Sequence, residues 1–404
     1  MTKRHTYFIS IFSLVFVIVT VLYPLTAWGA ESKLRPVPES LAHELEPTPD
    51  LKDKPSLSLE EAMELAYKYN PDLRSAELQL DRAEILRDLA ADSITFLPTG
   101  DMLVTPEGRV VVNSYEQADI NWKSAKKAAE SKKQEIEKSV IDAYASALKA
   151  YNQMELIKLQ QQELEAQNKL HQLATANGLF ANLDLRTSQL GMEQMESGLK
   201  ACEASYQLAL SQLRSLLNQS PDWQPVLVSK PIANEVECDE LWLEISRGEN
   251  QSIMMLQATA ALELEESKLY WGLGSSEEDP YLDKINLYLK QLNVEQAKKD
   301  TRNTVEQLYH SIEALEKQIS QKNIALQQKE QELQTAKLKY EVGVIPYRSL
   351  TGTESLASAE LAYKQAVKEL ESLRIDLVTL RANFGYITGQ QVYSKLDWAQ
   401  VEDN

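Results

Sequence analysis

The clearest heptad pattern in the chain lies in residues 305–340, which read VEQLYHSIEALEKQISQKNIALQQKEQELQTAKLKY. Apolar side chains recur there at alternating steps of three and four, and Lys322 and Lys329 are the polar interruptions. A second series with the same spacing follows after a short turn, from Leu356 to Phe384. Spacing sustained over this length predicts long helices that pack side by side as coiled coils.

The first half of the chain carries the same kind of pattern. Apolar residues at steps of four and three between Ile136 and Ile157 predict a helix over roughly 117–177. At about 1.5 Å per residue, that helix is a rod of roughly 90 Å, far longer than a globular helix needs to be. The sequence therefore predicts a mainly α fold, built from long antiparallel coiled-coil helices.

Two turns between long helices indicate that the halves of the chain repeat each other. Asn177-Gly178-Leu179-Phe180 parallels Val342-Gly343-Val344-Ile345, at an offset of 165 residues (343 minus 178). Glycine suits such turns, because a tight helix exit often needs a positive φ. The expected parts of the body are a first repeat at 57–220, a polar link at 221–236, a second repeat at 237–389 and a C-terminal tail at 390–404.

The N-terminus has the three parts of a secretory signal. Two basic residues precede an apolar run over 7–25, and Ala27-Trp28-Gly29 places small residues for cleavage before Ala30. We expect residues 1–29 to be a signal peptide that is removed. The alternative is an uncleaved anchor, because about 19 apolar residues can just span a bilayer. Either way the rest of the chain is exported, beginning with a proline-rich tether at 30–56.

Composition and charge argue against several classes of function. A formal net charge of −18 makes the chain a poor match for nucleic-acid phosphates. The four histidines are scattered, and the sequence has no glycine-rich phosphate loop, nucleophile elbow or zinc-ligand spacing. We therefore expect no enzyme and no catalytic, cofactor-binding or metal site. Cys202 and Cys238 are too few for a disulfide framework, and both a bridge between them and two free thiols stay open.

Three segments carry a resemblance to a known family. Residues 57–73 read LSLEEAMELAYKYNPDL, and residues 340–350 read YEVGVIPYRSL. Together with Phe96-Leu97-Pro98 and the duplicated coiled coils, they resemble the TolC-type outer-membrane efflux proteins. The resemblance covers about 57–389, and it rests on the order, spacing and duplication of the segments rather than on any one motif.

The resemblance implies a homotrimer that forms a duct. Each of three protomers contributes four helical columns to a hollow tube of twelve, capped by a barrel of twelve strands in the outer membrane. Such a tube is the exit duct of efflux pumps and type I secretion systems. Its implied partners are an inner-membrane pump and a periplasmic adaptor protein, also called a membrane fusion protein.

The resemblance also gives roles to the two turns. The helical tips would face the adaptor, and the residues expected to dock it are Gly178, Leu179, Phe180, Gly343, Val344 and Ile345. The alternative is a plain turn of a helical hairpin at each tip, which any coiled coil needs. Some members of the family carry a ring of acids after the second tip glycine, where this chain has Ser349 and Gly352. The charged residues near the tips that are candidates for a gate are Asp184, Arg186, Arg348 and Glu354.

The chain departs from the family in the part that would enter the membrane. The first repeat offers at most a short β-hairpin at 99–114, with arms shorter than the roughly 9–11 residues of a spanning strand. Between Leu269 and Leu289 the second repeat offers an acidic turn and no strand pair. Six short arms in a trimer would not close a membrane barrel.

Two functions follow from these observations. The first is a TolC-like conduit for efflux or type I secretion, in the outer membrane and periplasm, or at the cell surface if the organism has a single membrane. The second is a helical scaffold or interaction protein without a barrel, in the periplasm or at the cell surface. The retained tips and seams favour the conduit, because only assembly and docking would need them.

Overall fold

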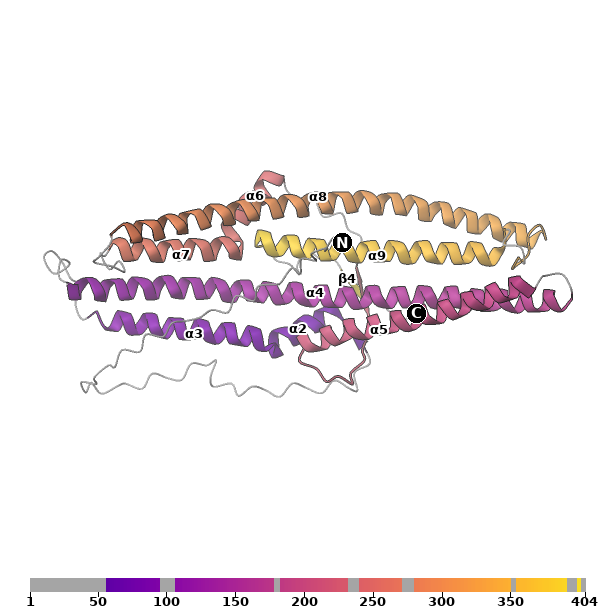
Figure 1. Cartoon of the computed structure of the whole chain (residues 1–404), viewed down its shortest axis with the longest axis horizontal. Coiled ribbons are helices and arrows are strands. Elements are labelled where there is room, and N and C mark those ends of the chain that lie inside the picture. Colours follow the sequence, from indigo (N-terminus) through magenta and orange to yellow (C-terminus); the bar gives the residue numbers. More distant parts are fainter. Residues whose placement is uncertain are drawn as a thin grey trace, which may run out of the picture.

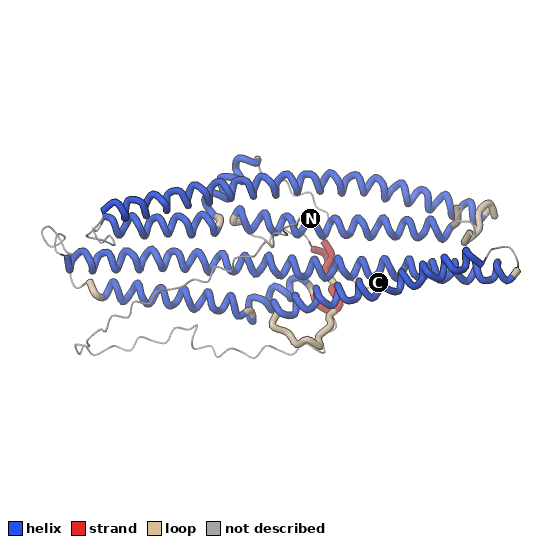
Figure 2. The backbone as a smooth tube through the Cα atoms, in the orientation of Figure 1, coloured by secondary structure: helices blue, strands red, loops and turns tan. Residues whose placement is uncertain are grey.

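The computed structural model describes residues 56–94, 106–177, 182–231, 240–270, 280–349, 354–390 and 398–400. Almost all of these residues are helical (Figure 2), as the heptad pattern predicted. The helices are α2 (Leu59–Tyr69), α3 (Pro71–Asp92), α4 (Pro106–Ala176), α5 (Asn182–Leu216), α6 (Leu241–Gln251), α7 (Ile253–Tyr270), α8 (Pro280–Glu341) and α9 (Leu356–Thr388). The short strands are β1 (Ser56–Leu57), β2 (Val226–Leu227), β3 (Ser229–Pro231) and β4 (Trp398–Gln400). In the described ranges, every helix is either too short or too polar to cross a membrane.

The helices form four columns that lie side by side along one long axis (Figure 1). One outer column is α8, and one inner column is α4. In the other inner column α7 and α9 follow one another end to end, and α3 and α5 share the remaining outer column. The principal packing contacts follow this order, because α4 packs against α3, α5, α7 and α9, while α8 packs against α7 and α9.

The order of the helices repeats along the chain. A short helix, a medium helix, a long helix and a second medium helix occur in α2 to α5 and again in α6 to α9. This is the duplication that the two glycine turns indicated. The helices of each set fall inside the expected repeats at 57–220 and 237–389, and the exact domain boundaries stay predictions.

The predicted heptad seam between residues 305–340 and 356–384 is a contact surface between α8 and α9. The buried residues of this seam are Val305, Ile312 and Ile319 on α8 and Leu370, Leu377 and Phe384 on α9. Lys322, which interrupts the apolar series, donates to Glu369 of α9 at 2.7 Å. The polar interruption therefore also joins the two helices.

The first helices begin at residues whose side chains satisfy free backbone N–H groups. Ser58 Oγ accepts from the Glu61 N–H at 3.2 Å, and Glu61 Oε2 accepts from the Ser58 N–H at 3.0 Å. This reciprocal pair is a capping box. Asn70 Oδ1 accepts from the N–H groups of Asp72 and Leu73 at the start of α3, and Asn70 Nδ2 donates to the Leu216 carbonyl at the end of α5. Asn70 therefore joins the two helices of one column.

The prediction of at most a short β-hairpin at 99–114 is wrong for the second arm of that hairpin. Residues 106–114 are the first turns of α4, and residues 99–105 lie outside the described ranges. Pro106 is tolerated as the first residue of the helix, because its missing N–H would have had no partner there. The valines at 110–112 favour strands locally, but Asn113 is buried and accepts from Ser267 Oγ of α7 at 3.3 Å. Packing against α7 thus outweighs the local preference.

A buried tyrosine joins three separate segments at the middle of the molecule. The Tyr144 hydroxyl donates to the Leu57 carbonyl at 3.0 Å and accepts from the Ser229 N–H at 2.9 Å. Ser229 Oγ in turn accepts from the Leu59 N–H at 3.0 Å. Tyr144 is fully buried in a core that includes Trp223 and Leu217. These bonds hold α4, the start of α2 and the strand β3 at one level.

We expect Tyr144→Phe to lower the free energy of unfolding by about 1–3 kcal/mol, because the Leu57 carbonyl and the Ser229 N–H each lose a partner inside the core. Urea denaturation followed by circular dichroism measures the change. Tyr151→Phe is the matched control, because Tyr151 lies on the same helix and is 37% exposed. Equal stability of the two variants would contradict the role given to Tyr144.

A pH series tests the same hydroxyl independently. Burial raises the pKa of Tyr144 to about 12, whereas a phenol in an unfolded chain ionises near pH 10. Between these values the unfolded state binds fewer protons than the folded state, so the free energy of unfolding falls as the pH rises from about 10 to 12. Tyr144→Phe should show a smaller fall in that window than the unmodified chain.

Candidate functional site

The turn between α8 and α9 is built by a glycine. Gly343 has a φ of +74°, its N–H donates to the Tyr340 carbonyl at 2.9 Å, and the Val344 N–H donates to the Lys339 carbonyl at 2.8 Å. These two bonds form the Schellman arrangement that ends a helix on a left-handed residue. The long helix α8 therefore stops at a defined place, with Val344 70% exposed beyond it.

The chain after this turn closes the start of α9. The Leu356 N–H donates to the Pro346 carbonyl at 3.2 Å, and the Ala357 N–H donates to the Tyr347 carbonyl at 2.9 Å. Ser355 Oγ accepts from the Ser358 N–H at 3.3 Å. The first N–H groups of a helix have no partner within it, so these contacts fix the turn against α9.

Arg348 connects this turn to the first repeat. Its Nε donates to Glu163 Oε1 at 3.2 Å and its Nη2 donates to Glu163 Oε2 at 3.1 Å, so the guanidinium grips the carboxylate of α4 with two bonds. The hydrogen bond to Glu163 is the main cause of a raised pKa at Arg348. The guanidinium also lies over the Tyr347 ring, 5.0 Å from its centroid. Tyr347 donates to Glu360 of α9 at 3.3 Å, and the negative charge of Glu360 raises the pKa of Tyr347.

Glu354, another residue proposed for a tip gate, is paired with a residue other than Arg348. Glu354 accepts from Lys339 Nζ at 2.6 Å, across the ends of α9 and α8. Arg186 is exposed on α5 and has no ion pair within the described ranges. Asp184 lies in the first turn of α5. Gly178, Leu179 and Phe180 lie outside the described residues.

Sequence reasoning missed Glu163, the partner of Arg348. It stands 185 residues before Arg348, inside a run of glutamines and glutamates on α4. The sequence offers many acids that could pair with Arg348, and which of them lies beside it depends on how the columns are aligned along the long axis. The repeat offered one signal, because Glu163 stands near the first glycine turn as Arg348 stands near the second.

The tip of the second hairpin presents apolar side chains to solvent. Val342 and Val344 are 77% and 70% exposed, and Leu338, Tyr340 and Tyr347 are exposed beside them. The Tyr340 and Tyr347 rings lie 5.9 Å apart between centroids. A rigid end with exposed apolar groups is a surface on which another protein can dock.

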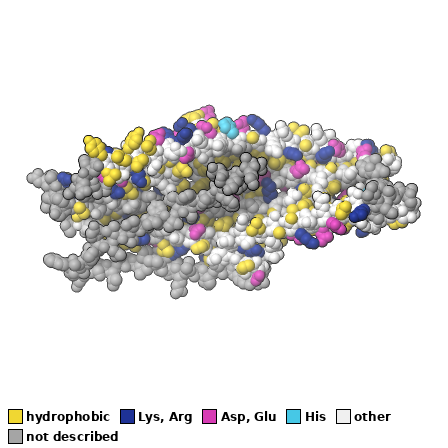
Figure 3. Space-filling model, in the orientation of Figure 1, with side chains coloured by type: hydrophobic (Ala, Val, Ile, Leu, Met, Phe, Trp, Pro, Cys, Tyr) yellow, Lys and Arg dark blue, Asp and Glu magenta, His cyan; other side chains and the backbone are white. Residues whose placement is uncertain are grey.

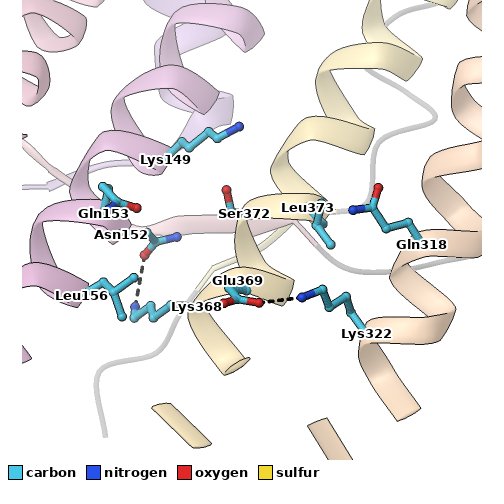
Figure 4. Close-up of a pocket in the computed structure, with 10 residues that line it drawn as sticks. All are labelled: Lys149, Asn152, Gln153, Leu156, Gln318, Lys322, Lys368, Glu369, Ser372 and Leu373. Carbon is cyan, nitrogen blue, oxygen red and sulfur yellow. Dashed lines mark hydrogen bonds and ion pairs between the residues drawn. The ribbon is translucent and has the colours of Figure 1, made fainter. Parts of the chain in front are cut away.

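A polar crevice lies farther from the tip, between α4, α9 and α8 (Figure 4). Its volume is about 270 Å³, and it is lined by lysines and amides. Lys149 donates to Asp376 at 2.6 Å, Lys322 donates to Glu369, and Lys368 donates to Asn152 at 3.1 Å. The ammonium groups are thus engaged in joining the columns. Among the described residues, no group of three or more His, Cys, Asp or Glu side chains is placed to hold a metal ion.

The Arg348–Glu163 contact can be measured by a double-mutant cycle. We expect Arg348→Ala and Glu163→Ala to be coupled by about 1 kcal/mol, because the pair is bidentate but only partly shielded from water. Urea denaturation of the two single variants and the double variant gives this number. The exposed pair Lys127–Glu130, 3.1 Å apart within α4, should show a smaller coupling. A coupling no larger than that of this control would contradict the bracing role.

Two glycine substitutions with opposite expected effects on the free energy of unfolding test the turn. Gly343→Ala should lower the free energy of unfolding by about 1 kcal/mol, because an L side chain resists positive φ, although open space surrounds the position. Gly191→Ala should raise it by about 0.5–1 kcal/mol, because alanine favours a helix interior and the new Cβ would lie 3.7 Å from Leu164. Thermal denaturation measures both, and an equal loss of stability at both positions would mean that the positive φ of Gly343 is not what makes its substitution costly.

No family model matches the sequence, and no curated protein matches it. Solved structures do match. The structure of CusC aligns at a TM-score of 0.59 and 15% identity, over 82% of this chain and 92% of CusC. Crystal structures of CusC concern the conformational changes that accompany its folding and transmembrane channel formation. The outer membrane protein VceC of Vibrio cholerae aligns at a TM-score of 0.57 and 16% identity, over 83% of this chain and 96% of VceC. The CmeC outer membrane channel of Campylobacter jejuni aligns at a TM-score of 0.57 and 12% identity, over 82% of this chain and 85% of CmeC.

These alignments include both repeats, since they span four fifths of the chain. At identities of 12–16% they establish the fold. The fold implied by the resemblance of residues 57–73 and 340–350 is thereby confirmed. The protein has the fold of the TolC-type outer-membrane efflux channels.

Proposed function

We propose that the protein is a passive TolC-like conduit across the cell envelope, serving efflux or type I secretion. The observation that carries the proposal is the open layer of four columns. The two inner columns pack on both sides, whereas α8 packs on one side only and α3 and α5 pack on α4. None of the principal contacts of the described chain joins α8 to α3 or α5.

An open layer of rods has two unlike edges, and copies that join edge to edge close into a ring. Three copies of four columns make a tube of twelve, as in the proteins that the sequence resembles. The lumen of such a tube is a path for solutes, and its walls need only be rigid and wettable. The conduit we propose is therefore a homotrimer in the outer membrane and periplasm, with no chemistry of its own.

The hairpin tips support a docking role. The exposed Val342 and Val344 stand at the end of two helices fixed by the Gly343 turn, so the tip is both apolar and rigid. We propose that the tips dock a periplasmic adaptor, which links the conduit to an energised inner-membrane pump. In the closed state Arg348 and Glu163 brace the tip, and separation of the two hairpins would have to break this pair.

A helical scaffold in the periplasm or at the cell surface is the second candidate. It is favoured by the short connections at the end opposite the tips. Thirteen residues separate Asp92 from Pro106 (93–105), and nine separate Tyr270 from Pro280 (271–279). They leave little chain to enter a membrane. A scaffold would keep the columns and the tips, but it would move no solute.

An export assay separates the two candidates. A strain without the protein is loaded with ethidium and its medium is analysed for secreted proteins, and the full chain or a variant is then supplied. We expect the unmodified chain and Ile324→Asp to restore export, and Val344→Asp to restore less than a tenth of it, because a charge on the tip weakens apolar docking. Ile324 is the control because it is also exposed, 17 residues before the end of α8 (341 minus 324).

The outcomes are distinct. Full restoration by Val344→Asp would contradict docking through the tip. Export that is unchanged by the presence of the protein, for ethidium and for every secreted protein, would contradict the conduit and favour the scaffold.

A further inference from the structure

The polar crevice between α4, α8 and α9 (Figure 4) differs in charge from the chain as a whole. Its walls include three lysines, Lys149, Lys322 and Lys368, one from each of the three helices. Of the described residues that line the crevice, one is an acid, Glu369. The whole chain has 60 acidic and 42 basic residues. The crevice is therefore a positively charged place in an acidic protein.

Two of these lysines are held by partners that lie outside the crevice. Lys149 donates to both carboxylate oxygens of Asp376, at 2.6 and 2.8 Å. Lys368 donates to Asn152 at 3.1 Å and to Glu371 at 3.2 Å. Asp376 and Glu371 are not among the residues that line the crevice. The two ammonium groups thus reach the crevice, while the acids that orient them do not.

Lys322 has the most capacity for a ligand. An ammonium group has three N–H donors, and within the described chain Lys322 uses one of them, to Glu369 at 2.7 Å. The side chains of Lys322 and Glu369 are 43% and 53% exposed, and an ion pair this open to water is worth little. An anion can therefore bind beside Glu369 or take its place.

The other walls of the crevice suit an organic anion. They consist of three amides, one hydroxyl and two leucines: Asn152, Gln153, Gln318, Ser372, Leu156 and Leu373. The amides and the hydroxyl can donate to anionic oxygens, and the leucines can contact an apolar group. The volume of about 270 Å³ lies just below the roughly 300–1,000 Å³ of sites for small molecules. The crevice therefore has room for a small anion or for the charged end of a larger one.

The crevice opens on the face of the layer that β1 and α2 leave free. The Tyr144 hydroxyl of α4 donates to the Leu57 carbonyl of β1, so these segments cover that side of α4. Gln153 stands nine residues after Tyr144 (153 minus 144), and at about 100° per residue it lies on the opposite side of the helix. In a ring of columns the additional segments have room only on the outside. The crevice would then be on the inner wall.

We propose that this crevice binds the charged group of a small organic anion, a carboxylate, a sulfonate or a phosphate ester, through Lys149, Lys322 and Lys368. Its role rests on the proposed conduit and names a class of substrate for it. A chain with a net charge of −18 repels anions over most of its surface. Lysines on the inner wall give an anion a place to bind inside an otherwise acidic tube.

Two ligands that differ in charge provide the first test. Apolar residues are exposed at the start of α8, among them Tyr281 and Ile285, and Figure 3 shows hydrophobic side chains gathered there. This surface can hold an aromatic ring of either charge. Equilibrium dialysis of the full chain should therefore compare naphthalene-2-sulfonate with the cation naphthalen-2-ylmethylammonium, which has the same ring. We expect the sulfonate to bind more tightly, although the net charge of the chain favours the cation. Equal or weaker binding of the sulfonate would overturn the proposal.

Two substitutions that break the same ion pair provide the second test. Lys322→Gln should weaken the binding of the sulfonate about fivefold and Glu369→Gln should strengthen it about threefold, because the first removes an attractive charge and the second a repulsive one. A pair that only joins α8 to α9 would give the same change in both variants. Circular dichroism checks that each variant keeps its helices.

Lys329→Gln is the matched control for Lys322→Gln. Lys329 lies one heptad farther along α8, is 41% exposed and pairs with Glu332, and it does not line the crevice. The sulfonate should bind this variant as it binds the unmodified chain. Equal weakening by Lys322→Gln and Lys329→Gln, or weakening by Glu369→Gln, would contradict a site in the crevice.

These outcomes are separable from those of the export assay. Dialysis requires no membrane, so a chain that binds the sulfonate as expected but exports nothing would leave the site standing and remove the conduit. Where the chain does restore export, Lys322→Gln should lower the export of naphthalene-2-sulfonate relative to that of ethidium, and Lys329→Gln should not. An unchanged ratio for Lys322→Gln would mean that the site has no part in transport.

Discussion

Lateral burial of an apolar seam is the constraint on which the rest of the structure depends. The helix α4 has 71 residues, about 105 Å of rod. Helical propensity alone stabilises such a rod only marginally in water, and most of its stability comes from packing. A neighbour is therefore needed along the whole length. The chain meets this need with shorter helices placed end to end, α3 with α5 and α7 with α9.

The positions of the apolar seams around each helix explain why the four columns form a layer. On α9, Leu370, Leu377 and Phe384 face α8, whereas Val378 and Ala382 join the core around α4. Each residue advances about 100° around a helix, so the second set lies roughly a third of a turn from the first. A rod with two seams this far apart holds two neighbours on different sides. Among the principal contacts of the described chain, none joins α8 to α3 or α5, so the two outer columns are not paired with each other within one copy.

The parts of the fold that local signals specify could be predicted from the sequence, and the parts that depend on alignment between columns could not. The Ser58 capping box, the break at Asn70 and the turn at Gly343 each need only a few neighbouring residues. The pairing of Arg348 with Glu163 depends on how the column of α4 and the column of α9 are aligned along the long axis. No local sequence pattern encodes this alignment. The start of α4 was mispredicted for a related reason, because the valines at 110–112 favour a strand until α7 is present. The tip of the first hairpin stays a prediction.

The hairpin tip and the seam between α8 and α9 are held by different forces, and this difference bears on the conduit proposed above. At the hairpin tip the contact between repeats is the partly exposed pair Arg348–Glu163, and Lys339–Glu354 joins the ends of α8 and α9. Ion pairs in water are worth little and weaken as salt rises. Apolar contacts such as those of Val305, Ile312 and Ile319 of α8 with α9 do not weaken in this way. If the protein is the proposed conduit, opening of the tip would have to break these ion pairs, whereas the apolar seam between α8 and α9 could stay in place.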